Sequence, residues 1–71
     1  MAFMNADDQL ARVQSEIDVV NGKIDNAEAQ LAVDGIDADS LAYWRAEKTQ
    51  LRAKETQLNE RVNILLKQQQ P

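Results

Sequence analysis

The chain lacks the side chains that most often carry catalysis or crosslink a small fold. Its 71 residues include no cysteine and no histidine, which excludes disulfides, thiolate metal sites and imidazole acid–base chemistry. There are two glycines and a single proline, which is the last residue, and aromatic residues make up only 4% of the chain. With so few residues that break helices, the composition favours an all-α chain.

Long hydrophobic runs and an excess of basic residues are also missing. No apolar stretch approaches the ~20 residues of a transmembrane helix, and residues 1–4 are too short and lack the basic residues of a signal peptide. Twelve acidic and eight basic residues give a formal net charge of −4, which disfavours nucleic acid or an anionic membrane surface as a partner. We therefore expect an intracellular protein with no membrane segment, in a compartment that the sequence does not specify.

What the chain does contain is a heptad pattern. Apolar residues recur at alternating intervals of three and four along the first half, and a second series follows. This spacing predicts two helices, each with one apolar seam. The seam residues are Leu10, Val13, Ile17, Val20, Ile24, Ala27 and Leu31 in the first series and Leu41, Trp44, Leu51, Leu58, Val62 and Leu65 in the second.

The first helix is predicted over about residues 5–33. Asn5 is a good N-cap, because its side chain accepts hydrogen bonds from the first helical N–H groups. The pair Asn21-Gly22 is a turn signal inside this range, but the apolar spacing continues through it. A continuous helix, weakened by ~1 kcal/mol at Gly22, is therefore favoured over a hinge.

A turn is predicted over residues 34–39, where Gly35 suits the left-handed position that follows a helix. The three aspartates of this segment are better explained as helix caps than as a calcium site, since an EF-hand spreads its ligands over twelve residues and ends in glutamate. The second helix is then predicted over about residues 40–69. Asp39 is its favoured N-cap.

The two seams fit each other in one antiparallel register. In such a pair, the numbers of facing residues have a constant sum; a sum of 75 pairs Leu31 with Trp44, and Ile17 with Leu58. The same register places the centre of the connection inside residues 34–39. Because two independent signals agree, we predict that residues 1–71 form a single domain, an all-α antiparallel helical hairpin or two-helix coiled coil.

Charged residues in and beside the seam are expected to fix this register more than to add stability, because exposed ion pairs contribute little. Lys48 and Glu55 occupy seam positions themselves. A catalytic role for these two is disfavoured, since no further reactive group joins them. The expected pairs are Glu28 with both Lys48 and Arg45, Lys23 with Glu55, and Glu16 with Arg61.

Apolar residues outside the seams predict self-association, because clusters of exposed apolar side chains usually mark an interface. We predict a homodimer of hairpins that forms a four-helix bundle, or packing against another helical protein. The alanines of the second helix are explained equally well by their helix propensity. The candidate interface residues are Phe3, Met4, Ala42, Ala46, Ala53, Ile64 and Leu66.

The second half of the chain contains LRAKETQL at residues 51–58 and ILLKQ at residues 64–68. Residues 44–70 thereby resemble the Leu-Arg-x-Lys-Glu-x-x-Leu helical segments of crinkler-type (crinkling-and-necrosis) effector proteins. The resemblance implies a helical accessory segment of a protein that acts inside a host cell, often in its nucleus. It carries over no catalytic residue.

The sequence therefore predicts a non-enzymatic module for oligomerisation or protein–protein interaction, with no metal or cofactor. The alternative is an accessory segment of an effector protein, with a possible nucleic-acid association. That association needs a basic face, for which Arg45, Lys48, Arg52 and Lys54 are the only candidates, and acidic residues interrupt them. An enzyme ranks last, because the chain lacks both histidine and cysteine.

Overall fold

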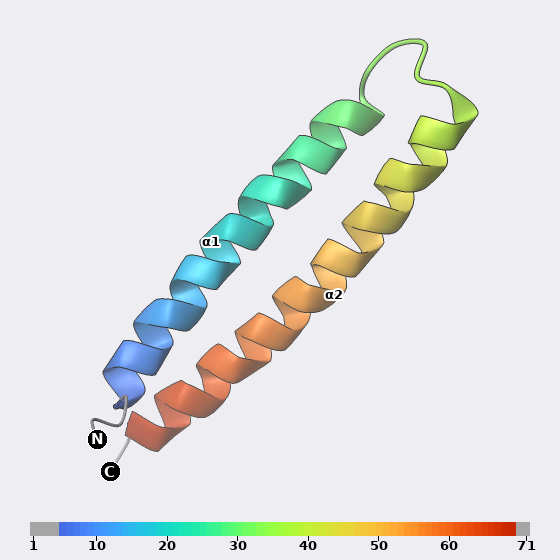
Figure 1. Ribbon diagram of the computed structural model, residues 1–71. Helices are drawn as coiled ribbons and strands as arrows, with labels where there is room; N and C mark the ends of the chain where they lie inside the picture. Colours follow the sequence, from blue (N-terminus) through green and yellow to red (C-terminus); the bar gives the residue numbers. More distant parts are fainter. Residues whose placement is uncertain (1–4, 70–71) are drawn as a thin grey trace.

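The computed structural model describes residues 5–69, which form two antiparallel helices, α1 (Ala6–Leu31) and α2 (Ala38–Gln69). The helices lie side by side along their length and are joined by one turn, so the start of α1 and the end of α2 meet at the open end (Figure 1). The molecule is a rod of 54 × 20 × 17 Å. The predicted all-α helical hairpin is confirmed.

The start of α1 follows the prediction. The Asp8 backbone N–H donates to Oδ1 of Asn5 at 2.8 Å, which makes Asn5 the N-cap. Asp7 and Asp8 occupy the first turn, where the positive end of the helix dipole favours carboxylates. The helix continues without interruption through Gly22. The continuous helix is therefore confirmed at this position, and the hinge interpretation is wrong.

α1 ends at Leu31, two residues before the predicted end. The Ala32 N–H is shared between carbonyls three and four residues earlier, and the Val33 N–H donates to the Gln30 carbonyl at 3.3 Å. Bonds to the third preceding residue tighten the last turn and end the helix. Gly35 has φ of +76°, the left-handed conformation that was predicted, but it lies within the turn and not directly after the helix.

α2 begins at Ala38, and its N-cap is Asp37, so the prediction of Asp39 was wrong. The Ser40 N–H donates to Oδ1 of Asp37 at 3.2 Å, and the Leu41 N–H donates to the Asp37 carbonyl at 2.9 Å. Hydrogen bonds from the Ser40 side chain and backbone lower the pKa of Asp37. Asp39 lies in the first turn of α2. The turn thus covers residues 32–37, and not 34–39.

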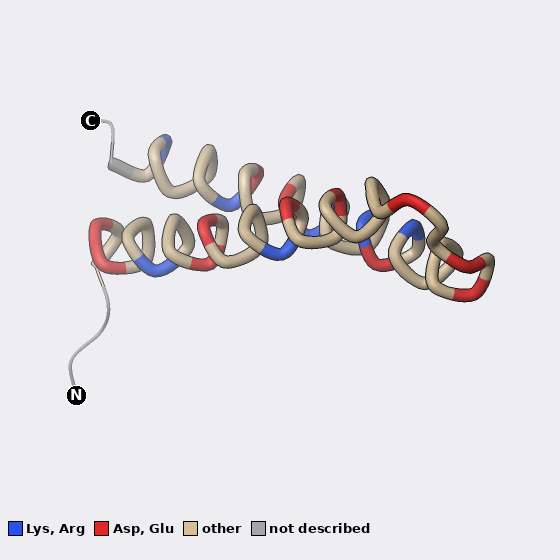
Figure 2. Tube along the Cα trace, turned by 90° about the horizontal axis from the view of Figure 1, so that it is seen from above, with Lys and Arg blue, Asp and Glu red and all other residues tan. Residues whose placement is uncertain are grey.

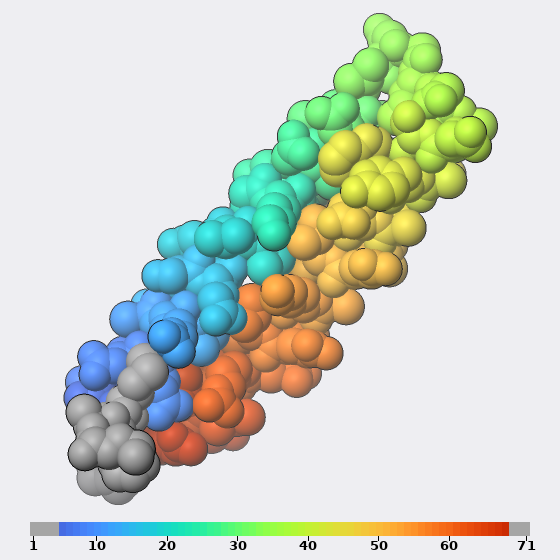
Figure 3. Space-filling view, viewed as in Figure 1, coloured from blue at the N-terminus to red at the C-terminus, as the bar shows by residue number. Residues whose placement is uncertain are grey.

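The core lies along the line where the two seams meet. Every predicted seam residue is buried or half-buried, and the space-filling view shows the helices packed together from the turn to the open end (Figure 3). Ile24 and Leu51, which face each other in the predicted register, share one cluster with Val20. The buried core residues are Val13, Val20, Ile24, Ala27, Leu51 and Leu65.

The core is narrow, because each helix contributes only one apolar stripe and the rest of its surface faces solvent. Val19, Val33 and Tyr43 are each more than half exposed. Neither α1 nor α2 has a stretch that is both long and apolar enough to cross a membrane.

Candidate functional site

A groove runs between α1 and α2 along one face of the hairpin. It has two sections of about 640 and 270 Å³, which share Arg12, Glu16 and Lys54 and are open to solvent. The first section is lined by Gln9, Arg12, Val13, Glu16, Lys54, Gln57, Leu58 and Arg61, and the second adds Ser15, Val19, Val20, Lys23 and Leu51. Together these residues define the groove.

The heptad pattern explains how the groove is built. Val13 and Val20 of α1 and Leu51 and Leu58 of α2 are seam residues that form the floor of the groove, and all but the half-buried Leu58 are buried. The polar rim comes from positions that flank the seam and recur every seven residues, such as Lys54 and Arg61 of α2. Residues seven apart lie on the same side of a helix in a coiled coil. The same kinds of heptad position therefore line the groove from Gln9 to Lys23 of α1.

The groove is the basic part of an acidic molecule. Arg12, Lys23, Lys54 and Arg61 line it with one acid, Glu16, which gives a formal charge of +3. Because the whole chain carries −4, the residues outside the groove carry −7. Acidic residues lie along both helices among the lysines and arginines, and the turn adds two aspartates and no lysine or arginine (Figure 2). Sequence analysis missed this set, and of its four candidates for a basic face only Lys54 lines the groove.

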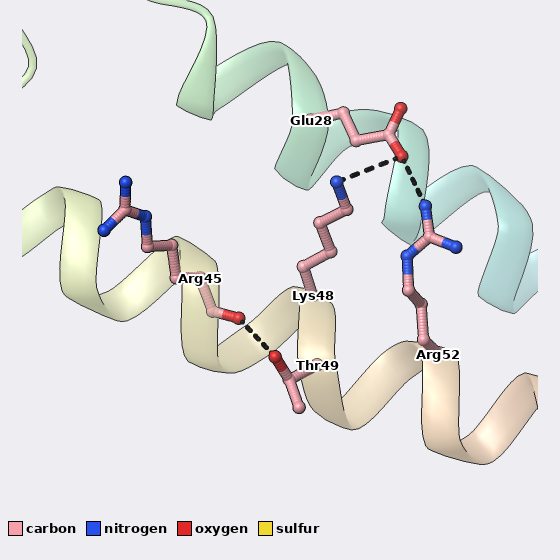
Figure 4. Close-up of polar contacts among 5 residues, drawn as sticks. All are labelled: Glu28, Arg45, Lys48, Thr49 and Arg52. Carbon is pink, nitrogen blue, oxygen red and sulfur yellow. Dashed lines mark hydrogen bonds and ion pairs between the residues drawn. The ribbon is translucent and has the colours of Figure 1, made fainter.

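A cluster of Glu28, Lys48 and Arg52 joins the helices outside the groove. Oε1 of Glu28 lies 3.5 Å from Nζ of Lys48 and 3.2 Å from Nη2 of Arg52 (Figure 4). The expected pair of Glu28 with Lys48 is therefore present. All three side chains are partly exposed, so each ion pair is worth only a few tenths of a kcal/mol.

The expected pair of Glu28 with Arg45 is wrong, and Arg52 takes that place. The Arg45 guanidinium points away from Glu28 (Figure 4). Helical side chains lean towards the N-terminus of their own helix. Because the helices are antiparallel, Glu28 leans towards the later residues of α2, and its carboxylate meets Arg52 instead of Arg45.

Two other expected pairs do not form within residues 5–69. Lys23 makes no ion pair with Glu55, and Arg61 makes none with Glu16; instead Nη2 of Arg61 donates to Oε1 of Gln9 at 3.3 Å. Long exposed side chains have several acceptors of nearly equal energy, since each contact is worth little. Their choice of partner is therefore not fixed by heptad position.

The candidate interface residues do not share one face of α2. Ile64 is 50% exposed and Leu66 is 42% exposed, whereas Leu65 between them is buried. Because successive helical residues point about 100° apart, Ile64 and Leu66 lie on different sides of the helix. Ala42, Ala46 and Ala53 are exposed. Phe3 and Met4 lie outside the described residues.

Two aromatic residues pack against each other near the turn. Trp44 is a half-buried seam residue, and its ring meets that of Tyr43 edge to face, with centroids 5.0 Å apart and planes at 82°. This geometry is typical of aromatic packing. In the part of the chain that the structure describes, no group of three or more acidic side chains is arranged to hold a metal ion.

The chain matches no protein-family model, no curated protein and no solved structure. The resemblance of residues 44–70 to crinkler-type effector segments stays a prediction. The features on which a function can be argued are the helical hairpin and its basic groove.

Proposed function

We propose that this chain is a non-enzymatic protein–protein interaction module that binds a helix in its groove. The observation that carries the proposal is the apolar surface of Val19, which is 57% exposed, and of the half-buried Leu58 in the groove. A further helix laid between α1 and α2 covers such a surface and converts a two-helix seam into the core of a bundle. Burial of that surface supplies the driving force.

The dimensions of the groove suit a short helix. Its α1 wall runs from Gln9 to Lys23, about four helical turns, or roughly 21 Å. A partner segment of about 14 residues spans this length. Such a helix places apolar residues at intervals of three and four towards the groove, the spacing used by amphipathic helices that bind in grooves.

A library experiment tests helix binding without knowledge of the natural partner. Peptides with leucine at heptad positions and randomised flanking positions are selected against the immobilised chain. We expect binders whose affinity falls at least tenfold with Val19→Glu, because Val19 is 57% exposed and lines the groove. The matched control is Val33→Glu, a valine 52% exposed outside the groove. Binders that Val19→Glu and Val33→Glu affect equally would count against the groove.

We also propose that two hairpins associate into a four-helix bundle. The supporting observation is the exposure of Leu66 near the open end of the hairpin; Ile64 is also exposed, on a different side of α2. Light scattering over a range of concentrations tests this. We expect the mass to rise from the 8.0 kDa of one chain to twice that value, and Leu66→Glu to shift the midpoint to higher concentration. A mass that stays at 8.0 kDa at every concentration would exclude self-association.

A further inference from the structure

Four of the eight cations of this molecule line the groove. Outside the groove, Lys48 and Arg52 share the carboxylate of Glu28. In the groove, Arg12, Lys23 and Lys54 form no ion pair with any of residues 5–69. Arg45 and Lys67, outside the groove, make no ion pair within residues 5–69 either, so what distinguishes the groove is that four cations line it with a single acid.

The unpaired cations lie on both rims of the groove. Arg12 and Lys23 come from α1, and Lys54 comes from α2; all three line the same section, with Glu16 as the only acid there. Like charges gathered in one section repel each other and work against the compact state. A ligand that brings negative charge to both rims removes this repulsion, and the apolar residues between the rims favour a ligand with an apolar stripe.

We propose that the groove binds an acidic amphipathic helix of another protein, an inference that rests on the function proposed above. The helix places its apolar stripe over Val19 and Leu58, and its flanking carboxylates reach the cations of both rims. Charge complementarity of this kind selects the partner and accelerates encounter. The partner segment is therefore rich in Asp and Glu at the positions beside its apolar residues.

The same charges disfavour two other occupants. A second copy packed groove to groove sets one +3 surface against another, which is repulsive. A nucleic acid presents phosphates but no apolar stripe, and it meets the −7 carried by the rest of the chain. Neither uses the apolar surface and the basic rims together as an acidic helix does.

Two synthetic peptides test the proposal directly. Both are 18-residue amphipathic helices with leucine at heptad positions; one carries glutamate and the other lysine at the flanking positions. Fluorescence anisotropy of labelled peptide measures binding to the full chain. We expect the glutamate peptide to bind at least tenfold more tightly than the lysine peptide, and Lys54→Glu to reduce or reverse that preference. The matched control is Arg45→Glu, an equal charge change outside the groove, which leaves the preference unchanged.

Circular dichroism shows whether each variant is folded, and Lys23→Glu gives a second test in the groove if Lys54→Glu unfolds. Equal binding of both peptides, with sensitivity to Val19→Glu retained, would overturn the acidic partner and leave helix binding in place. If neither peptide and no library peptide binds, the proposed function itself fails. A dimer that Lys54→Glu strengthens would assign the groove to a second copy. Duplex DNA that competes with the glutamate peptide and loses affinity with Lys54→Glu would assign it to phosphate.

Discussion

The two glycines of the chain should respond in opposite directions to the same substitution. A Cβ atom added at Gly22 or at Gly35 meets no heavy atom within 4 Å, so steric clash plays no part at either position. Gly22 lies inside α1 and is exposed to solvent, whereas Gly35 lies in the turn with φ of +76°. The backbone conformation alone therefore decides the sign of the effect.

Gly22→Ala should stabilise the hairpin by about 1 kcal/mol, which is the difference in helix propensity between the two residues. Gly35→Ala should destabilise it by roughly 1 kcal/mol: a left-handed conformation costs alanine about 1–2 kcal/mol, partly offset by the lower entropy of the unfolded chain. In a domain of this size, 1 kcal/mol shifts Tm by about 4–8 °C.

Urea unfolding followed by circular dichroism at 222 nm measures both effects, and an unchanged m-value shows that the unfolded state has not altered. The two variants differ only in position, so each serves as the control for the other. Loss of stability with Gly22→Ala would refute the continuous helix and indicate a bend at Gly22. A neutral Gly35→Ala would show that the turn does not require its left-handed residue.

Three further predictions concern the core and the caps. Leu51→Ala should cost about 2–4 kcal/mol because it opens the central cluster, whereas Val19→Ala, at an exposed site, should stay within about 0.5 kcal/mol by urea unfolding. Asn5→Ala should cost about 1 kcal/mol by the same assay, through loss of the N-cap of α1. The lowered pKa of Asp37 means that its ionised form stabilises the fold at neutral pH, and that this contribution is lost as pH falls through the folded pKa. Tm measured from pH 7 to pH 2 should therefore show the wild type and Asp37→Asn converging below about pH 4.

The hairpin was predictable because its signals repeat. Each seam residue adds the same information about helix phase, and the register that pairs Ile24 with Leu51 also places the turn near Gly35. An error at one position does not change the answer when many positions agree. The helix bounds lack this redundancy. Asp37, Asp39 and Ser40 are all good N-caps, and only the backbone geometry shows that Asp37 is the one used.

The ion pairs were predicted only in part, because the heptad position of a residue does not specify the direction in which its side chain extends. The constant sum of residue numbers shows which Cα atoms face each other. A carboxylate at the end of a long side chain, however, lies about one turn towards the N-terminus of its helix. That displacement brings Glu28 to Arg52 instead of Arg45. The residue types were right, and the direction in which the side chains extend decided the partners.

The groove was missed because its charges are dispersed in the sequence. Arg12 and Lys23 come from α1, and Lys54 and Arg61 come from α2, so no basic run marks them. The signal existed in the flanking heptad positions, but reading it required the register to be fixed first. Net charge, a single number for the whole chain, averages a basic groove with an acidic remainder.

The opposite signs of the groove and of the whole chain lead to an unusual salt dependence. The hairpin is 17–20 Å across, about twice the Debye length of ~8 Å at physiological ionic strength. An acidic helix in the groove then senses the nearby +3 and is screened from most of the −7 beyond it. At about 0.01 M salt the Debye length grows to ~30 Å. The negatively charged residues outside the groove then also repel the acidic helix. Affinity for the glutamate peptide should therefore pass through a maximum at intermediate salt, measured by anisotropy from about 0.01 to 0.5 M. A steady rise in affinity down to the lowest salt would show that the acidic remainder does not oppose binding.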